Sequence, residues 1–350
     1  MSFPFLQPYA GLSNSLQTAQ AAGGAGGVGG WVELARTTVG TTGDPLDVSS
    51  LSDKRYYMVL LDHQASGSSQ PNGRFNSDSG SNYAYRFEND GSGGSGVNKS
   101  NMKTANGWNT SEYGVWYISN LAAREKLSYY ACTTDRGSGA GTAPSRSWTL
   151  NKWTNTSNAI NAINFQQGGG GGNFAAGSEC VVLGYDPDDT HTTNFWEELA
   201  SVELGSAGDE LSTGSFTGKR YLWVQVFTIN SGATNAKFTY NNDTGSNYAF
   251  RYSNDGAADG TSTSDSSIQL NVANGSAFYN MFIVNVASRE KFGLGDIVDQ
   301  NTAGAGTAPN RSRSSFKWAN TSSQITEIDV TNNAAGSYDT GSIIKVWGSD

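Results

Sequence analysis

Short aromatic and β-branched segments alternate along the chain with turns rich in Gly, Asn and Ser. Residues 55–62 ("RYYMVLLD") and 220–227 ("RYLWVQVF") are two such segments. In "NYAYRFE" (82–88), aromatic residues occupy every second position, which is the period of a strand with one buried face. No segment has a helical period of useful length. The pattern therefore predicts an all-β protein made of short antiparallel strands.

The chain contains two copies of one sequence unit. The phrase "DSGSNYAYRFENDG" (78–91) returns as "DTGSNYAFRYSNDG" (243–256), an offset of 165 residues. The offset holds through most of both copies and slips to 164 only near the end, where 177–184 matches 341–348. Solenoids and propeller blades repeat at about 20–50 residues, so this unit is too long for either. Each copy must be a complete domain with its own core.

We therefore expect four segments. They are an N-terminal aromatic arm with a Gly/Ala-rich linker (1–30), a first β-sandwich (31–185), an acidic and polar linker (186–194) and a second β-sandwich (195–350). We expect about eight or nine strands in each sandwich. The best single topology is a jelly roll formed by two antiparallel sheets, and another Greek-key sandwich is the alternative.

Composition excludes two classes of partner. The net charge is −9 and the isoelectric point is near 4.8, whereas a nucleic-acid-binding protein needs a basic surface to neutralise phosphates. No apolar run approaches the roughly 20 residues of a membrane-spanning helix. The first residues also lack the basic and apolar regions of a secretory signal. We predict no nucleic-acid partner and no membrane association.

The duplication acts as an internal control for chemistry, because a function shared by both copies needs its residues in both. Cys132 and Cys180 match isoleucines, which predicts that both behave as small buried hydrophobic residues. His63 matches Thr228, and His191 lies in the linker, so no Ser-His-Asp set can be built in both copies. We predict that the protein is not an enzyme and has no catalytic, cofactor-binding or metal-binding residues.

Charged residues that agree between the copies are predicted to serve structure. Asp78, Asp90, Asp243 and Asp255 stand near glycines, where an aspartate bonds its own backbone in a turn, and the "NDG" sequences predict tight hairpins. Arg86 and Arg251 are expected to tie the two sheets of a sandwich to each other, with ligand binding as the alternative. A glycan-degrading enzyme, which needs two facing carboxylates, is a minor alternative. The matched carboxylates are Glu33/Glu198, Asp44/Asp209, Asp78/Asp243, Asp90/Asp255 and Glu125/Glu290.

Two further segments have alternative interpretations. "DPDD" (186–189) groups three carboxylates, and Ca²⁺ takes six to eight oxygen ligands, but the spacing of an EF-hand is absent. A solvated linker is favoured there, and Ca²⁺ binding near Asp186–Asp189 stays open. The arm carries Phe3, Phe5, Leu6 and Tyr9 ahead of a Gly-rich stretch that predicts a flexible linker. It is expected to dock on another subunit or protein, with a disordered terminus as the alternative.

The repeated motifs also resemble a known group of proteins. The run "WVELARTT", followed by "KRYYMVL", "GSNYAYR", "REK", "GTAP" and "GSECVVLG", resembles jelly-roll modules in structural proteins of tailed phages, especially marine ones. The resemblance spans both copies and nearly all of the chain beyond residue 30. It implies a virion structural protein of the capsid-decoration or tail and fibre class, and it implies no catalytic residues.

From these observations we expect an outer capsid decoration, or cement, protein. Such a protein would form homo-oligomers, dock on neighbouring virion proteins and lie on the outer surface of the virion. One alternative is a tail-fibre or receptor-binding adhesin that recognises host glycan, and another is a capsid shell protein with a doubled jelly roll. The candidate glycan-stacking residues for the adhesin are Trp31, Trp153, Trp196 and Trp318.

Overall fold

The structure, a computed structural model, describes residues 30–350 except 44–45, 105–110, 169–170, 190–192 and 271–274. The predicted arm residues Phe3, Phe5, Leu6 and Tyr9 lie outside this described part. Within it, the chain forms β-strands and no α-helix. Consequently, no helix in these ranges has the length and apolar character of a membrane span.

The first copy is built from strands β1 to β14. They are β1 (Val32–Thr38), β2 (Leu46–Val48), β3 (Tyr56–His63), β4 (Ala65–Ser66), β5 (Pro71–Phe75), β6 (Tyr83–Asn89), β7 (Ser92–Lys99), β8 (Met102–Lys103), β9 (Glu112–Ser119), β10 (Lys126–Thr134), β11 (Ser145–Trp153), β12 (Ile163–Gln167), β13 (Asn173–Phe174) and β14 (Glu179–Tyr185).

The second copy is built from strands β15 to β28. They are β15 (Glu197–Glu203), β16 (Glu210–Ser212), β17 (Tyr221–Thr228), β18 (Asn230–Ser231), β19 (Ala236–Tyr240), β20 (Tyr248–Asn254), β21 (Gly260–Asp265), β22 (Ile268–Gln269), β23 (Ala277–Val284), β24 (Lys291–Asp299), β25 (Asn310–Trp318), β26 (Ile328–Asn332), β27 (Ser337–Tyr338) and β28 (Ile343–Ser349).

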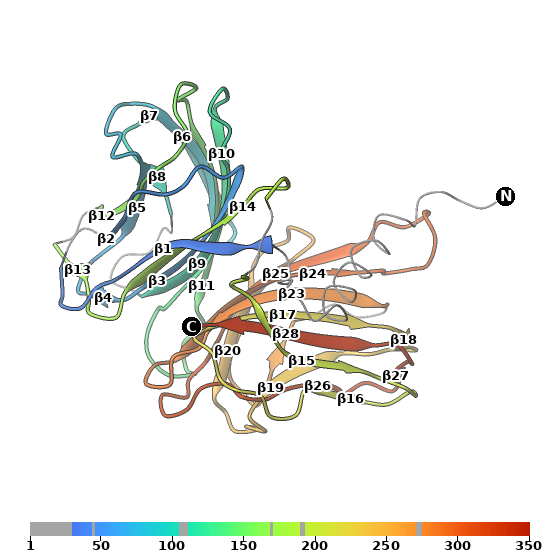
Figure 1. Cartoon of the computed structure of the whole chain (residues 1–350). Helices are drawn as coiled ribbons and strands as arrows, with labels where there is room; N and C mark the ends of the chain where they lie inside the picture. The colour runs from blue at the N-terminus through green and yellow to red at the C-terminus, as the bar shows by residue number, and fades with distance from the viewer. Residues whose placement is uncertain (1–29, 44–45, 105–110, 169–170, 190–192, 271–274) are drawn as a thin grey trace.

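The two copies have the same sheet topology. In the first, the large sheet has the order β1-β14-β3-β9-β10-β11-β6-β7 and the smaller sheet the order β2-β12-β5-β8. The second repeats this as β15-β28-β17-β23-β24-β25-β20-β21 and β16-β26-β19-β22, and each copy adds a two-stranded sheet. Figure 1 shows the first sandwich in blue to green and the second in yellow to red. The prediction of two tandem antiparallel sandwiches of the jelly-roll type is confirmed, although the described residues of each copy form 14 strands, several only two or three residues long.

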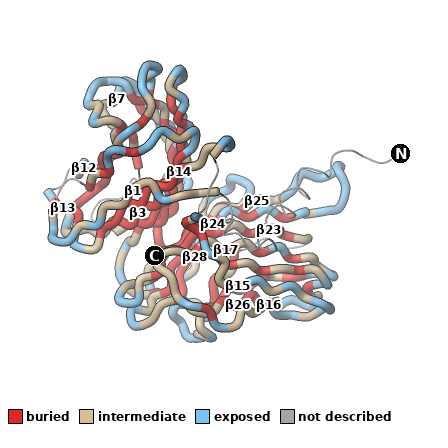
Figure 2. The backbone as a smooth tube through the Cα atoms, in the orientation of Figure 1, coloured by how far each residue is buried: buried red, intermediate tan, exposed pale blue. Residues whose placement is uncertain are grey.

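A separate hydrophobic core fills the space between the two sheets of each copy. In the first, Trp116 of the large sheet stacks on Phe75 of the smaller sheet, with ring centroids 5.3 Å apart. In the second, Tyr279 packs edge-on against Phe238 at the same distance. Figure 2 shows the buried residues running along the sheets and the exposed residues gathered in the loops. Each copy therefore has the core that an independent domain requires.

The repeated phrase fixes a buried tryptophan in each copy. The Asp78 carboxylate accepts a hydrogen bond from the Trp153 indole at 2.7 Å, and Asp243 accepts the matching bond from Trp318, also at 2.7 Å. Each carboxylate also accepts the backbone N–H two residues further along its own loop, at 2.8 and 2.9 Å. The aspartate therefore satisfies a buried indole and closes its loop at the same time.

The second half of the phrase forms the predicted hairpin turns. Asp90 and Gly91 have φ angles of 49° and 81°, and Asp255 and Gly256 have 52° and 77°. Two successive residues with positive φ characterise the turn whose twist matches that of the flanking strands. The turn prediction is confirmed in both copies.

Candidate functional site

The outer faces of the two large sheets pack against each other. They form a third hydrophobic cluster, to which both copies contribute. The first copy supplies side chains from β3, β9 and β14, and the second supplies side chains from β17, β23, β24 and β28. The buried members are Met58, Leu60, Tyr113, Val115, Val181, Leu183, Phe195, Trp196, Tyr221, Phe282, Val284, Phe292, Leu294 and Trp347.

One row of the first sheet takes part in many of the polar contacts at this interface. Glu179, Asp62, Tyr113 and Thr133 lie directly opposite one another on the successive strands β14, β3, β9 and β10. Directly opposed residues of neighbouring strands present their side chains on the same face of a sheet. The row therefore faces the second copy as one continuous surface.

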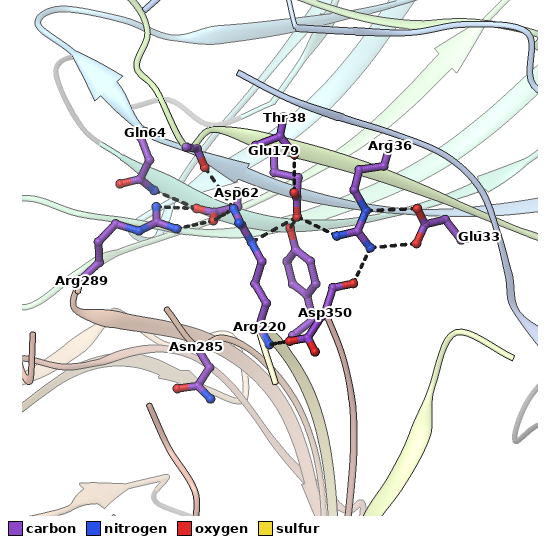
Figure 3. A network of polar contacts seen from close by, with 12 residues as sticks. Glu33, Arg36, Thr38, Asp62, Gln64, Glu179, Arg220, Asn285, Arg289 and Asp350 are labelled. Carbon is purple, nitrogen blue, oxygen red and sulfur yellow. Dashed lines mark hydrogen bonds and ion pairs between the residues drawn. The ribbon is translucent and has the colours of Figure 1, made fainter. Parts of the chain in front are cut away.

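Asp62 is the centre of the polar contacts. Its buried carboxylate accepts two hydrogen bonds from the Arg289 guanidinium, at 3.0 and 2.6 Å, and one from Arg220 at 2.7 Å. Both arginines belong to the second copy, as Figure 3 shows. A buried carboxylate loses its hydration, and three charge-assisted hydrogen bonds compensate for that loss.

Glu179 extends this network beside Asp62. Its carboxylate accepts a hydrogen bond from the Tyr221 hydroxyl at 2.7 Å and another from Thr38 at 2.5 Å. It also forms ion pairs with Arg220 at 3.1 Å and Arg36 at 3.4 Å. Burial, together with the charges of Asp62 and Glu179, raises the pKa of the Tyr221 hydroxyl far above its ordinary value. Tyr221 therefore stays protonated and acts as a hydrogen-bond donor between the copies.

The network continues on strands β10 and β25. The Thr133 hydroxyl contacts the Gly293 carbonyl at 2.6 Å and the Ser315 hydroxyl at 2.9 Å. Lys317 is fully buried, lies 3.4 Å from Glu290 and donates to the Gly137 carbonyl at 2.5 Å. Contacts of this kind bind the two copies into one body along this side of the sheets.

At two points of the interface, a residue of one copy contacts its own counterpart in the other. The rings of Tyr117 and Phe282, which match at the 165-residue offset, lie 6.5 Å apart. The Arg313 guanidinium lies over the ring of its counterpart Trp148, 4.8 Å from the centroid. Contacts between equivalent residues are the mark of a twofold axis. The two copies are therefore related by an approximate twofold axis that lies between their large sheets.

Only one side of this twofold interface is closed. We define the closed half by six residues that are at most 6% exposed, and the open half by their six counterparts in the other copy, which are 38% to 57% exposed. An ideal twofold would bury both halves equally. In the order closed and then open, the matched residues are Asp62 and Phe227, Tyr113 and Phe278, Thr133 and Val298, Tyr221 and Tyr56, Phe292 and Leu127, and Ser315 and Leu150.

The open half is apolar on both copies. In the second copy, Phe227, Phe278 and Val298 are direct neighbours across β17, β23 and β24 and share one face of the sheet. In the first copy, the open half lies in a concave pocket of about 600 Å³ with no charged residue in its lining. The pocket is lined mainly by Trp31, Tyr56, Tyr117, Leu127, Leu150 and Tyr185. This pocket is the candidate binding site of the chain.

The structure corrects the predicted glycan-stacking residues. Trp153, Trp196 and Trp318 are each 1% exposed, so a sugar in solvent cannot stack on them, and the prediction is wrong for these three. Two of them fill sandwich cores, and Trp196 fills the interface between the copies. Trp31 is half-buried and lines the pocket.

The predicted ties between the sheets of one sandwich are also corrected. Arg86 is exposed, because its side chain lies on the outer face of the large sheet near its β7 edge. Arg251 does form a tie, but between the copies: it lies 3.1 Å from Asp90 and donates to the Pro144 carbonyl at 2.9 Å. Asp255 stays within its own copy, where it accepts the Arg311 backbone N–H at 2.8 Å.

One polar cluster inside the first sandwich was not predicted. His63 and Ser69 are hydrogen-bonded at 3.0 Å, and Glu112 lies directly opposite His63 on the neighbouring strand. Glu112 accepts its hydrogen bond from Tyr130, at 2.6 Å, instead of orienting the histidine. Burial raises the pKa of Glu112 to about 7 and lowers that of His63 to about 4, against a small opposing effect of Asp62. His63, Ser69 and Glu112 are at most 2% exposed, so a substrate has no route to the cluster.

The remaining candidates lie in structural positions. Cys132 and Cys180 are free and buried, as predicted for small hydrophobic residues. Asp189 of the acidic linker forms an ion pair with Lys54. Among the described residues, which exclude 190–192, no group of three or more His, Cys, Asp or Glu could hold a metal ion. Ca²⁺ binding therefore has no preformed ligand set in this part of the chain.

The residues that organise the interface were missed by the sequence reasoning. Asp62 and Glu179 match Phe227 and Ile343, so the comparison of the copies removed both from the candidates. A charge in one copy that is replaced by an apolar residue in the other was the signal that could have found them. It marks a face that the two copies use differently.

Comparisons with known proteins give little beyond the fold. No family model matches the chain, and no curated protein matches it. Seven chains of solved structures match. One is the LG1-3 region of the laminin alpha2 chain, with 9% identity, 90% of this chain and 64% of that chain covered, and a TM-score of 0.21. Another is domains LG4-5 of the mouse laminin alpha1 chain, with 9% identity, 92% and 90% covered, and a TM-score of 0.17.

This chain thus spans less than two thirds of the laminin alpha2 region. Likenesses of this size support no statement about activity or partners. The assignment as paired β-sandwiches rests on the strand order of the two copies.

Proposed function

We propose that this chain is a non-enzymatic viral structural protein, an outer capsid decoration protein that forms homo-oligomers and docks on the shell. The observation that carries the proposal is that the charged groups between the copies are paired with one another. The carboxylates of Asp62 and Glu179 are buried, and their charges are matched by Arg220 and Arg289. Such a network gives rigidity and leaves no charged group free for acid–base chemistry.

The acidic surface and the resemblance to phage jelly-roll modules support the same proposal. A decoration protein lies outside the shell, away from packaged DNA, and needs no basic face. Two sandwiches locked through their sheets form a rigid unit, as a structural role requires. A capsid shell protein with a doubled jelly roll is a variant of the same structural role.

A second candidate, a tail-fibre or receptor-binding adhesin that recognises host glycan, is favoured by one observation. Trp31, Tyr56, Tyr117 and Tyr185 bring four aromatic rings to one accessible pocket, and sugars stack on such rings. The pocket is uncharged, so a neutral glycan would be its ligand.

The test is the number of copies in each virion, measured by quantitative mass spectrometry of purified particles against the major capsid protein. The decoration proposal expects copies in the hundreds. A handful to a few dozen would contradict it and favour the adhesin. Absence from the particle would contradict both.

A further inference from the structure

The open half of the interface exposes apolar side chains that its counterpart buries. On the first copy, Tyr56, Leu127 and Leu150 stand around the pocket, and on the second copy the row of Phe227, Phe278 and Val298 is exposed. Exposed apolar groups gathered at one site, on a face whose other half is a buried interface, mark a binding surface. The contacts of Asp62 and Lys317 hold the closed half together. No element among the described residues covers the open half in the same way.

The N-terminal segment enters the molecule at this surface. The described chain begins at Gly30, and the next residue, Trp31, is itself part of the pocket lining. Only 21 residues separate Tyr9 from Trp31. A chain of this length has a root-mean-square span of about 25 Å when it behaves as a Gly-rich coil. Residues 3–9 are therefore tethered within reach of the pocket.

The chemistry of the segment matches that of the pocket. Residues 1–30 contain no Asp, Glu, Lys or Arg, in a chain where 15% of residues are charged, and the pocket lining has no charged residue either. The sequence "FPFLQPY" (3–9) offers Phe3, Phe5, Leu6 and Tyr9. A proline has a restricted φ angle, and the two prolines of this sequence therefore lower the conformational entropy lost on docking. A pocket of this size takes several apolar side chains.

We propose that residues 3–9 pack into the open half of their own chain and cover the pocket around Trp31. The tether decides between the same chain and a neighbour. A short flexible connection gives the attached segment an effective concentration in the millimolar range. A second molecule at micromolar concentration competes poorly against it. This docking involves a single chain, so the proposal does not depend on whether the protein is a virion component.

Site-specific photo-crosslinking of the full-length chain tests the proposal. A benzophenone amino acid replaces Leu127, the most exposed residue of the open half, and the matched control carries it at Val97, an apolar residue of β7 that is even more exposed. Equal amounts of ¹⁴N and ¹⁵N protein are mixed before irradiation. Trypsin releases the arm on the peptide 1–36, because Arg36 is the first basic residue.

The expected result is a crosslink from position 127 to peptide 1–36 that carries a single isotope, with at least a tenfold lower yield from position 97. The triple variant Phe3→Ser, Phe5→Ser, Leu6→Ser should abolish the crosslink and keep the melting temperature of the sandwiches. Mixed-isotope crosslinks would overturn the proposal, because the arm would then dock on a neighbouring chain. Crosslinks only to residues 195–350, or an undiminished yield in the triple variant, would overturn it as well.

Discussion

Tyr221 and Tyr56 occupy the same position in the two copies, yet Tyr221 is fully buried while Tyr56 is 40% exposed. Tyr221 donates its hydroxyl to Glu179 across the interface, and Tyr56 lines an apolar pocket. Equivalent surfaces of the two copies therefore have different roles within one chain. The closed half holds the copies together, and the open half presents an apolar binding surface.

Arg289 should contribute to the stability of the protein, whereas its counterpart in the first copy, Arg124, should not. We predict that Arg289→Ala lowers the free energy of unfolding by about 3 kcal/mol, because it removes two of the three hydrogen bonds that arginines donate to the buried Asp62 carboxylate. The matched variant Arg124→Ala, at an exposed position of the first copy, should change it by less than about 0.5 kcal/mol. Urea denaturation measures both. Equal losses would mean that Asp62 does not bridge the copies.

A second matched pair tests the opposite side of the closed half. Lys317 is buried against Glu290, whereas its counterpart Lys152 forms an ion pair with Glu125 in which both side chains are more than 40% exposed. We predict that Lys317→Met costs about 3 kcal/mol, since it leaves a carboxylate without its cation. Lys152→Met should be nearly neutral because exposed ion pairs contribute little. Guanidinium denaturation would contradict this account if both variants proved neutral.

The aspartates of the repeated phrase should act alike in both copies. We predict that Asp78→Ala and Asp243→Ala each lower the free energy of unfolding by about 1–3 kcal/mol, because each leaves a buried indole N–H without an acceptor. Asp78→Asn and Asp243→Asn keep an oxygen in that place and should cost less. A loss in one copy alone would show that the two loops are not equivalent.

The same aspartates predict that the folded protein loses stability in acid. Partial burial favours a raised pKa for Asp78 and Asp243, but hydrogen bonds from the indole, from a backbone N–H and from an asparagine outweigh it and lower the pKa. Their stabilisation is complete above the ordinary carboxylate pKa near 3.8 and is lost as the pH falls through the lower native value. Thermal melts between pH 5 and 2 should therefore show a weaker pH dependence in the double Asn variant than in the wild type.

Glu112 should give the opposite dependence. Burial raises its pKa from 4.5 to about 7, so the native state holds a proton that the unfolded chain has released. The free energy of unfolding is then greatest below pH 4.5 for this group and falls by about 3 kcal/mol as the pH rises through 7. We predict that Glu112→Gln, which can still accept from Tyr130, raises the melting temperature at pH 8 more than at pH 5. An equal rise at both pH values would contradict the raised pKa.

The sequence predicted the duplicated sandwiches because periodicity and repetition are local properties. Tyr83 and Tyr248 alternate with polar neighbours, and the Asp-Gly turns carry their own backbone preference, so strand and turn could be read from short segments. The interface could not be read in this way. Asp62 is paired with residues more than 150 positions away, and its counterpart is Phe227. The comparison of the two copies selects positions where both carry the same kind of residue. A face that the two copies use differently therefore appears in it only as positions where the residues differ.

The burial of the tryptophans shows a related limit. Trp31 and Trp196 match in sequence, and nothing in the local pattern separates them. Trp196 is buried in the hydrophobic cluster between the copies, while Trp31 borders the open half. Which of two equivalent aromatic residues is accessible depends on the packing of whole domains, which local periodicity does not encode.

Hydroxyl-radical footprinting of the wild type and of the Phe3→Ser, Phe5→Ser, Leu6→Ser variant tests the half-open interface most directly. The account predicts that Tyr221 and Phe292 stay protected in both proteins. Tyr56 and Leu127 should be protected in the wild type and become several-fold more oxidised in the variant. If Tyr221 were oxidised as readily as Tyr56 in the variant, the closed half would not exist in solution, and the central claim would be wrong.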